Sequence, residues 1–179
     1  MKNFEFEHEG QKLWYSRSLA CSLIVLKVGD GNKIPEILIS KRGSGCEFGA
    51  GLWCVPGGFI DFDEDAIDCA IRETFEETGI DVSKFKNDIK LISLDSEPNK
   101  TRQSMCAYHL LVINKEQTKN WKFSIKNSEP NEVDEIKWIP ISEIDNYNWL
   151  SNQKKYITNL LIDGFLDIYK YKNIKNGNQ

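Results

Sequence analysis

Apolar residues along the chain gather in short runs that polar or glycine-rich segments separate. The runs at 18–28 and 36–40 flank the turn-rich stretch 29–33, which predicts a β-hairpin. Four later runs also have the length of strands, at 53–55, 89–94, 105–113 and 133–139. Together these runs predict a mixed β-sheet in a protein of the α/β class.

The apolar period becomes helical between 63 and 78, which predicts the clearest helix of the chain. Asp63 is the expected N-cap and Gly79 the expected left-handed C-cap. Pro140 is expected to open a short helix, and apolar residues at helical spacing predict a C-terminal helix over 152–170.

Glycines break this pattern in two places ahead of the predicted helix. The stretch 41–52 holds four of them, more than the interior of a helix or strand tolerates, and is expected to be a loop. Gly57 and Gly58 follow Pro56, and the chain is expected to turn there and to allow close approach of a ligand.

Length and composition predict one domain that spans 1–179, because 179 residues with 40% hydrophobic content support one large core. A net charge of -4 leaves no broad basic surface and argues against DNA as a partner. No apolar run reaches the length of a membrane span, so we expect a cytoplasmic chain. The five cysteines lack any C-x-x-C pair and are expected to be reduced, buried thiols.

Three carboxylates form a stripe on the predicted helix, to one side of its apolar face. Glu73, Glu76 and Glu77 lie at i, i+3 and i+4, where like charges destabilise a bare helix. Arg72 or a bound hard cation could compensate, and Mg²⁺ prefers oxygen ligands of this kind. A solvated helix face is the alternative reading of the same stripe.

The spacing of these residues resembles the 23-residue box of the Nudix hydrolases. Gly58 is followed after five residues by Glu64, and after seven more by the segment 72–80, which reads RETFEETGI. The family places a bulky aliphatic residue where this chain has Thr74, a departure on the packing face. The similarity covers about 18–145, with the C-terminal helix beyond it.

The resemblance implies a Nudix-type α/β/α sandwich with a mixed sheet and a site that binds Mg²⁺, or Mn²⁺ in its place. The groups that correspond to metal ligands are the Gly57 carbonyl and Glu73, Glu76 and Glu77. Arg72 and Glu64 correspond to the pair that orients the helix. The general base is left open among Glu76, Glu73 and the loop residue Glu132, which could equally be an ordinary exposed acid.

The expected activity is hydrolysis of a diphosphate bond in a nucleoside diphosphate linked to another group, such as a nucleotide sugar, ADP-ribose, a dinucleoside polyphosphate or a triphosphate. Arg42, Arg102 and Gln103 are candidate substrate contacts. The alternative is a surface ion pair for Arg42 and a plain turn for Arg102 and Gln103. Trp53 is expected in the core rather than stacked on a base. A nucleotide-binding regulatory domain without catalysis is the rival function, and the family resemblance favours a homodimer.

Overall fold

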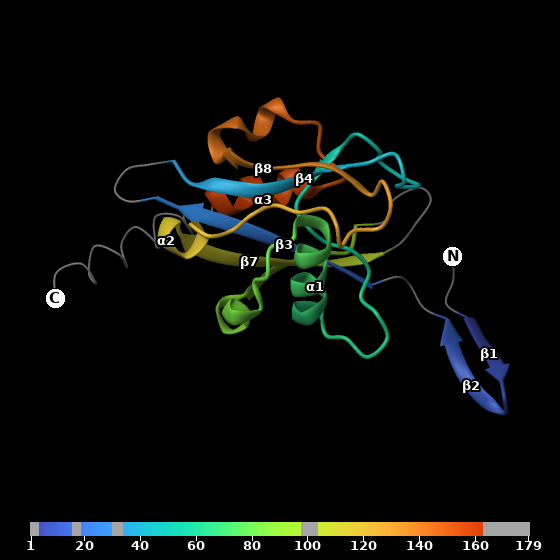
Figure 1. The fold of residues 1–179 in the computed structure, drawn as a ribbon. Helices are drawn as coiled ribbons and strands as arrows, with labels where there is room; N and C mark the ends of the chain where they lie inside the picture. The colour runs from blue at the N-terminus through green and yellow to red at the C-terminus, as the bar shows by residue number, and fades with distance from the viewer. Residues whose placement is uncertain (1–3, 16–18, 30–33, 98–103, 163–179) are drawn as a thin grey trace.

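Six strands form the main sheet of this computed structural model, which describes residues 4–15, 19–29, 34–97 and 104–162 (Figure 1). The strands run in the order β5-β4-β3-β7-β6, and β8 pairs with the free side of β4. Among the strands that the structure describes, β3 and β7 pair in parallel and the other pairs of this sheet are antiparallel, so the predicted mixed sheet is confirmed. The strands are β3 (Leu19–Val28), β4 (Glu36–Arg42), β5 (Trp53–Cys54), β6 (Lys90–Asp95), β7 (Met105–Asn114) and β8 (Val133–Pro140).

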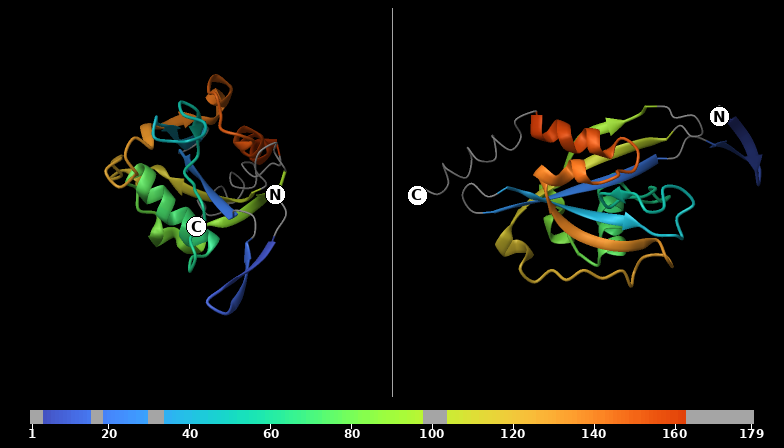
Figure 2. Two further views of the ribbon diagram at one scale, coloured as in Figure 1. Left: turned by 90° about the vertical axis from the view of Figure 1, so that its right-hand side faces the viewer. Right: turned by 90° about the horizontal axis from the view of Figure 1, so that it is seen from above.

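Helices cover both faces of the sheet and complete the α/β/α sandwich (Figures 1 and 2). The helix α1 (Ala66–Thr78) and the 3-10 helix η1 (Ser83–Asp88) pack on one face. The 3-10 helix η2 (Ile141–Asn146) and α3 (Gln153–Ile162) pack on the other, and the short α2 (Lys115–Thr118) follows β7. Because both faces are covered, β3 is buried without a break from Cys21 to Leu26.

The helix α1 begins at its capping residue and ends at a glycine. The side chain of Asp65 accepts hydrogen bonds from the backbone N–H groups of Ile67 and Asp68 at 2.8 and 2.9 Å. Asp65 is therefore the N-cap, and the prediction of Asp63 was wrong by two residues because several acids in this loop satisfy the same rule. Gly79 has φ 73 and its N–H donates to the Phe75 carbonyl, which confirms the C-cap.

A second, two-stranded sheet precedes the main one and was not predicted. It is formed by β1 (Phe4–His8) and β2 (Gln11–Tyr15), which pair antiparallel and project from the body in Figure 1. Glu9 and Gly10 form its turn, both with positive φ. The alternation of Phe and Glu in 4–7 was the available signal. That the chain forms a single domain stays a prediction.

Other expectations concern the thiols and the C-terminal helix. All five cysteines are free; Cys21, Cys54 and Cys69 are buried, whereas Cys46 and Cys106 are partly exposed. The described part of the C-terminal helix is α3, and the remainder of the predicted range 152–170 lies outside the described residues. Across the described ranges, no helix has the length and apolar character needed to cross a membrane.

Candidate active site

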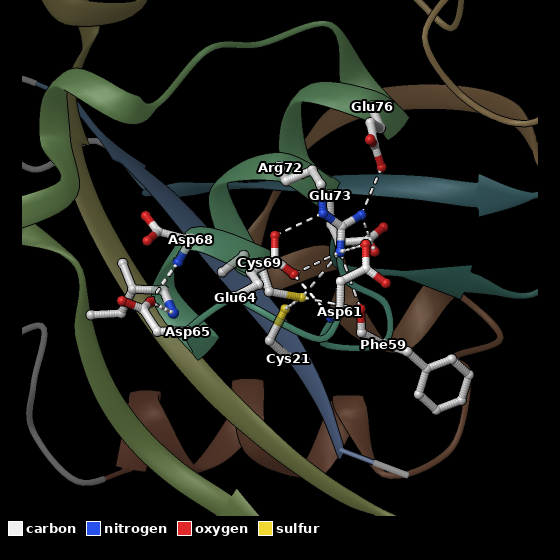
Figure 3. Close-up of polar contacts among 12 residues, drawn as sticks. Cys21, Phe59, Asp61, Glu64, Asp65, Asp68, Cys69, Arg72, Glu73 and Glu76 are labelled. Atoms are coloured by element: carbon white, nitrogen blue, oxygen red, sulfur yellow. Dashed lines mark hydrogen bonds and ion pairs between the residues drawn. The ribbon is translucent and has the colours of Figure 1, made fainter. Parts of the chain in front are cut away.

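Arg72 extends from the middle of α1, and several acidic and polar groups surround its guanidinium (Figure 3). Its Nε and Nη2 donate to the two oxygens of Glu64 at 2.8 and 3.0 Å, a bidentate ion pair. Its Nη1 donates to Glu73 Oε1 at 2.8 Å and to Glu76 Oε2 at 2.9 Å. Nη2 also reaches the Phe59 carbonyl at 3.1 Å. The carboxylates of Glu73 and Glu76 therefore converge on one positively charged nitrogen.

Two of the carboxylates that share this arginine, Glu64 and Glu73, have pKa values shifted in opposite directions. The Arg72 hydrogen bond lowers the pKa of Glu64 below its ordinary value. Burial raises the pKa of Glu73, and the neighbouring charge of Glu76 raises it further, although Arg72 acts in the other direction. Glu64 is thus a satisfied ion-pair partner, while Glu73 lacks sufficient positive charge around it.

Glu77 points into the protein and is only 3% exposed. Burial, followed by the negative charge of Glu73, raises the pKa of Glu77 to about 8. The hydroxyl of Ser40 in β4 donates to Glu77 Oε2 at 3.0 Å and opposes this rise. Sequence reasoning did not select Ser40; the available signal was a polar residue at the end of an otherwise apolar strand.

The two glycines before α1 let the backbone approach both β3 and the acid cluster. The carbonyl of Gly58 accepts a hydrogen bond from the N–H of Cys21 at 2.9 Å. A Cβ at Gly58 would lie 2.3 Å from Glu73 Oε1, and one at Gly57 would lie 2.3 Å from the Cys21 carbonyl. Any larger residue would displace either the strand or the carboxylate, and the close approach of a ligand at this turn stays a prediction.

Glu132, in the loop that precedes β8, acts on the same cluster through its charge. It is half-buried, and its negative charge contributes to the raised pKa values of Glu73 and Glu77. Its Oε2 accepts a hydrogen bond from the Glu129 N–H at 3.1 Å. Three segments distant in sequence, α1, β4 and this loop, therefore contribute to one acidic region.

The candidate substrate contacts are only partly described. Arg42, the last residue of β4, donates from Nε to the Phe48 carbonyl at 3.1 Å, in the glycine-rich loop. Arg102 and Gln103 lie outside the described residues. The role of all three in substrate binding stays a prediction.

Trp53 belongs to the core, as expected. It is 9% exposed, and its ring meets that of Tyr147 edge-on at 5.2 Å between centroids. Lys137 Nζ lies 4.3 Å from the Trp53 ring centroid.

The donor chemistry of the acidic region fits a hard divalent cation. The carboxylates of Glu64, Glu73 and Glu76 face a single guanidinium, and Glu77 lies buried beside Glu73. The pKa values of Glu73 and Glu77 are raised by burial and by neighbouring negative charge. Mg²⁺ prefers such oxygen ligands and would supply the missing positive charge. Within the described residues, no three His, Cys, Asp or Glu side chains stand together at metal-binding geometry, and Arg72 lies between Glu73 and Glu76.

Comparison with known proteins decides the family. A sequence model of the NUDIX domain matches residues 19–160, most of the chain. The chain belongs to the Nudix family. The match covers the whole main sheet, and it leaves out the β1–β2 hairpin.

Curated Nudix relatives include an m7GpppN-mRNA hydrolase of Saccharomyces cerevisiae, 30% identical over 110 residues, which are 62% of this chain and 10% of that protein. An mRNA decapping complex subunit of Schizosaccharomyces pombe is 50% identical over 42 residues, 24% of this chain and 6% of that one. The chain thus matches about a tenth or less of the length of these relatives.

Solved structures share the fold at low identity. The NUDIX domain of Shewanella oneidensis NrtR, solved with ADP ribose, has a TM-score of 0.62 and 18% identity, covering 80% of this chain and 86% of that one. A bifunctional NMN adenylyltransferase/ADP ribose pyrophosphatase from Francisella tularensis, solved with AMP and a Mn ion, has a TM-score of 0.65 and 23% identity, covering 83% and 42%. These likenesses establish the Nudix fold.

Proposed function

We propose that this Nudix chain hydrolyses a diphosphate bond in a nucleoside diphosphate linked to a second group, with Mg²⁺ or Mn²⁺ as cofactor. The observation that carries the proposal is the convergence of Glu73 and Glu76 on one positive charge, beside the buried Glu77. A cation held there would offset the acidity of the region and attract the negative oxygens of a diphosphate.

In this proposal the residues divide the work between binding and proton transfer. Glu73, Glu76 and Glu77, with the Gly57 carbonyl, would hold the cation, and Arg72 with Glu64 would fix the orientation of the carboxylates. When bound, Mg²⁺ supplies a Lewis acid that neutralises charge on the diphosphate oxygens and lowers the pKa of a water molecule.

The reaction adds water across one P–O bond. The water oxygen forms a bond to one phosphorus, the bond from that phosphorus to the bridging oxygen breaks, and the second phosphate leaves. A glutamate takes the proton of the attacking water, and Glu76, Glu73 and Glu132 are the candidates for this base. The influence of the Glu132 charge on the pKa values of Glu73 and Glu77 supports its candidacy.

The relatives suggest which substrates to test first. Two are named for the hydrolysis of capped mRNA or for decapping, and structural neighbours contain ADP ribose or AMP. The net charge of -4 favours a small nucleotide over a long RNA, whose phosphates bind basic surfaces. Cytoplasmic location, dimerisation and the absence of a DNA partner stay predictions.

The test is hydrolysis in ¹⁸O-water with product masses as the readout. The panel contains ADP-ribose, a nucleotide sugar, a dinucleoside tetraphosphate, an oxidised nucleoside triphosphate, a capped dinucleotide and a capped RNA. We expect Mg²⁺-dependent cleavage of at least one compound between phosphates, with one ¹⁸O in one product and no cleavage in EDTA. Tight binding without cleavage would favour the regulatory alternative, and neither binding nor cleavage by folded protein would contradict the proposal.

A further inference from the structure

The glycine-rich loop after β4 is hydrogen-bonded to the loop that carries Glu132. The N–H of Gly43 donates to the Glu132 carbonyl at 2.7 Å, and the N–H of Gly45 donates to the Asn131 carbonyl at 2.8 Å. The thiol of Cys46 donates to the same Glu132 carbonyl at 3.3 Å. We call Gly43, Gly45 and Cys46 the glycine clasp.

The first two positions of the clasp have no room for a side chain. A Cβ at Gly43 would lie 2.2 Å from the Asn131 carbonyl oxygen and 2.8 Å from Asp134 Oδ1. A Cβ at Gly45 would lie 2.6 Å from the Pro130 carbonyl oxygen. Because the nearest obstacles are backbone atoms, any substitution must move the 130–132 loop.

Contacts within the loop that carries Glu132 also hold its backbone in place. Asn131 has a φ of 60, a left-handed conformation that neighbouring contacts must maintain. The Glu132 N–H donates to the Glu129 carbonyl, and the Glu132 carboxylate accepts the Glu129 N–H, both at 3.1 Å. Immediately afterwards β8 begins at Val133, which pairs with Arg42 at the end of β4. The backbone of Glu132 is thus held from both sides.

We propose that Gly43 and Gly45 are positioning residues, which hold Glu132 against the acids of α1 so that its carboxylate takes the proton from the attacking water. This inference rests on the proposed function and assigns the base that the sequence left open. It also explains why a loop with four glycines adjoins the site: two of them allow backbone-to-backbone contact.

The test is a double-mutant cycle between Gly43→Ala and Glu132→Gln, with kcat and KM measured for a substrate from the panel. Displacing a base by about 1 Å costs on the order of 100-fold in rate, so we expect Gly43→Ala to lower kcat by about 10- to 100-fold with KM nearly unchanged. In the Glu132→Gln background the same substitution should change kcat by less than about 3-fold, because no base remains to be misplaced.

Gly51→Ala is the matched control from the same loop. Gly51 has φ 80, so alanine is strained there, but its Cβ would meet nothing within 4 Å. We expect it to lower stability while leaving kcat almost unchanged. Cys46→Ala removes one donor without a clash and should produce a smaller loss of kcat than Gly43→Ala if the clasp is right.

Hydrogen exchange supplies a readout apart from turnover. Amides of 130–133 should exchange faster in Gly43→Ala than in Gly51→Ala, while affinity for Mn²⁺ stays at the wild-type value. Equal losses of kcat in the wild-type and Glu132→Gln backgrounds would overturn the positioning role and leave the proposed function intact. Normal kcat in Glu132→Gln would overturn the assignment of the base. An inactive wild type would overturn the proposed function itself.

Discussion

The acidic region is assembled from two parts that the chain builds in different ways. Residues of α1 contribute Glu73, Glu76 and Glu77 from one regular helix, capped at both ends by its own neighbours. The loop before β8 contributes Glu132, and contacts from the glycine clasp, more than eighty residues earlier in the chain, fix its backbone. The helix part depends on local structure and the loop part on tertiary contact, so substitutions should affect them differently.

The largest effect is expected from the helix part. Glu76→Gln removes a charge from the proposed cation site and one candidate base, and should lower kcat by about 1,000-fold or more at saturating Mg²⁺. Its circular dichroism and substrate affinity should stay close to those of the wild type, because Glu76 is 39% exposed and its ion pair within the described residues is with Arg72. Unaltered turnover would show that Glu76 takes no part in the reaction.

Arg72→Ala tests whether the acids of α1 depend on the guanidinium that they share. Removing the guanidinium leaves Glu64 and Glu73, whose side chains are only 14% and 13% exposed, without an ion-pair partner. We expect a loss of unfolding free energy on the order of 2–3 kcal/mol, measured by urea denaturation. Added Mg²⁺ should restore part of that loss, and a loss that Mg²⁺ leaves unchanged would count against a cation site here.

Glu77 predicts a pH dependence of stability within the helix part. Its pKa is about 8 in the folded protein against 4.5 as the ordinary value, so the folded state holds the proton more tightly. The contribution of the protonated Glu77 carboxyl group to the unfolding free energy is therefore present at low pH and is lost as pH rises from about 5 through 8.

The measurement is the unfolding free energy of wild type minus that of Glu77→Gln, without metal, over this pH window. The difference should fall as pH rises, by up to about 1.4 kcal/mol for each pH unit in which Glu77 is ionised in the unfolded chain and protonated in the folded protein. Subtraction cancels opposing groups such as His109, whose pKa burial lowers. A difference that rises with pH would mean that the Glu77 charge is already compensated.

The smallest effect concerns the cap that starts the helix. Asp65→Ala should lower the unfolding free energy by about 1 kcal/mol, because the N–H groups of Ile67 and Asp68 lose their acceptor. Asp63→Ala removes the same charge from the same loop and should change stability by only a few tenths of that amount. Equal effects would indicate loop charge, rather than capping, as the cause.

The sequence predicted the helix part of the site better than the loop part, for a physical reason. Spacing along α1 determines which carboxylates share a side, so Glu73, Glu76 and their contact with Arg72 could be predicted. The main strands were also located to within about two residues, because buried strands form distinct apolar runs.

Contacts between distant segments could not be derived in the same way. The Ser40–Glu77 hydrogen bond and the Gly43–Glu132 hydrogen bond depend on how β4 is placed in the sheet. The β1–β2 hairpin was missed because its alternation of apolar and charged residues is short, and the N-cap was misplaced among four acids in five residues, 61–65. Glycines 43 and 45 indicated a loop, but the carbonyls they approach were not visible in the sequence.

The most direct test of the cation site is a calorimetric titration of Mn²⁺ into the protein with a non-hydrolysable diphosphate nucleotide present. The wild type should bind Mn²⁺ and the double variant Glu73→Gln/Glu76→Gln should not, whereas Glu116→Gln/Glu143→Gln, which removes two exposed acids elsewhere, should bind as the wild type does. Equal Mn²⁺ binding by all three proteins would contradict the proposal that the acids of α1 hold the cation.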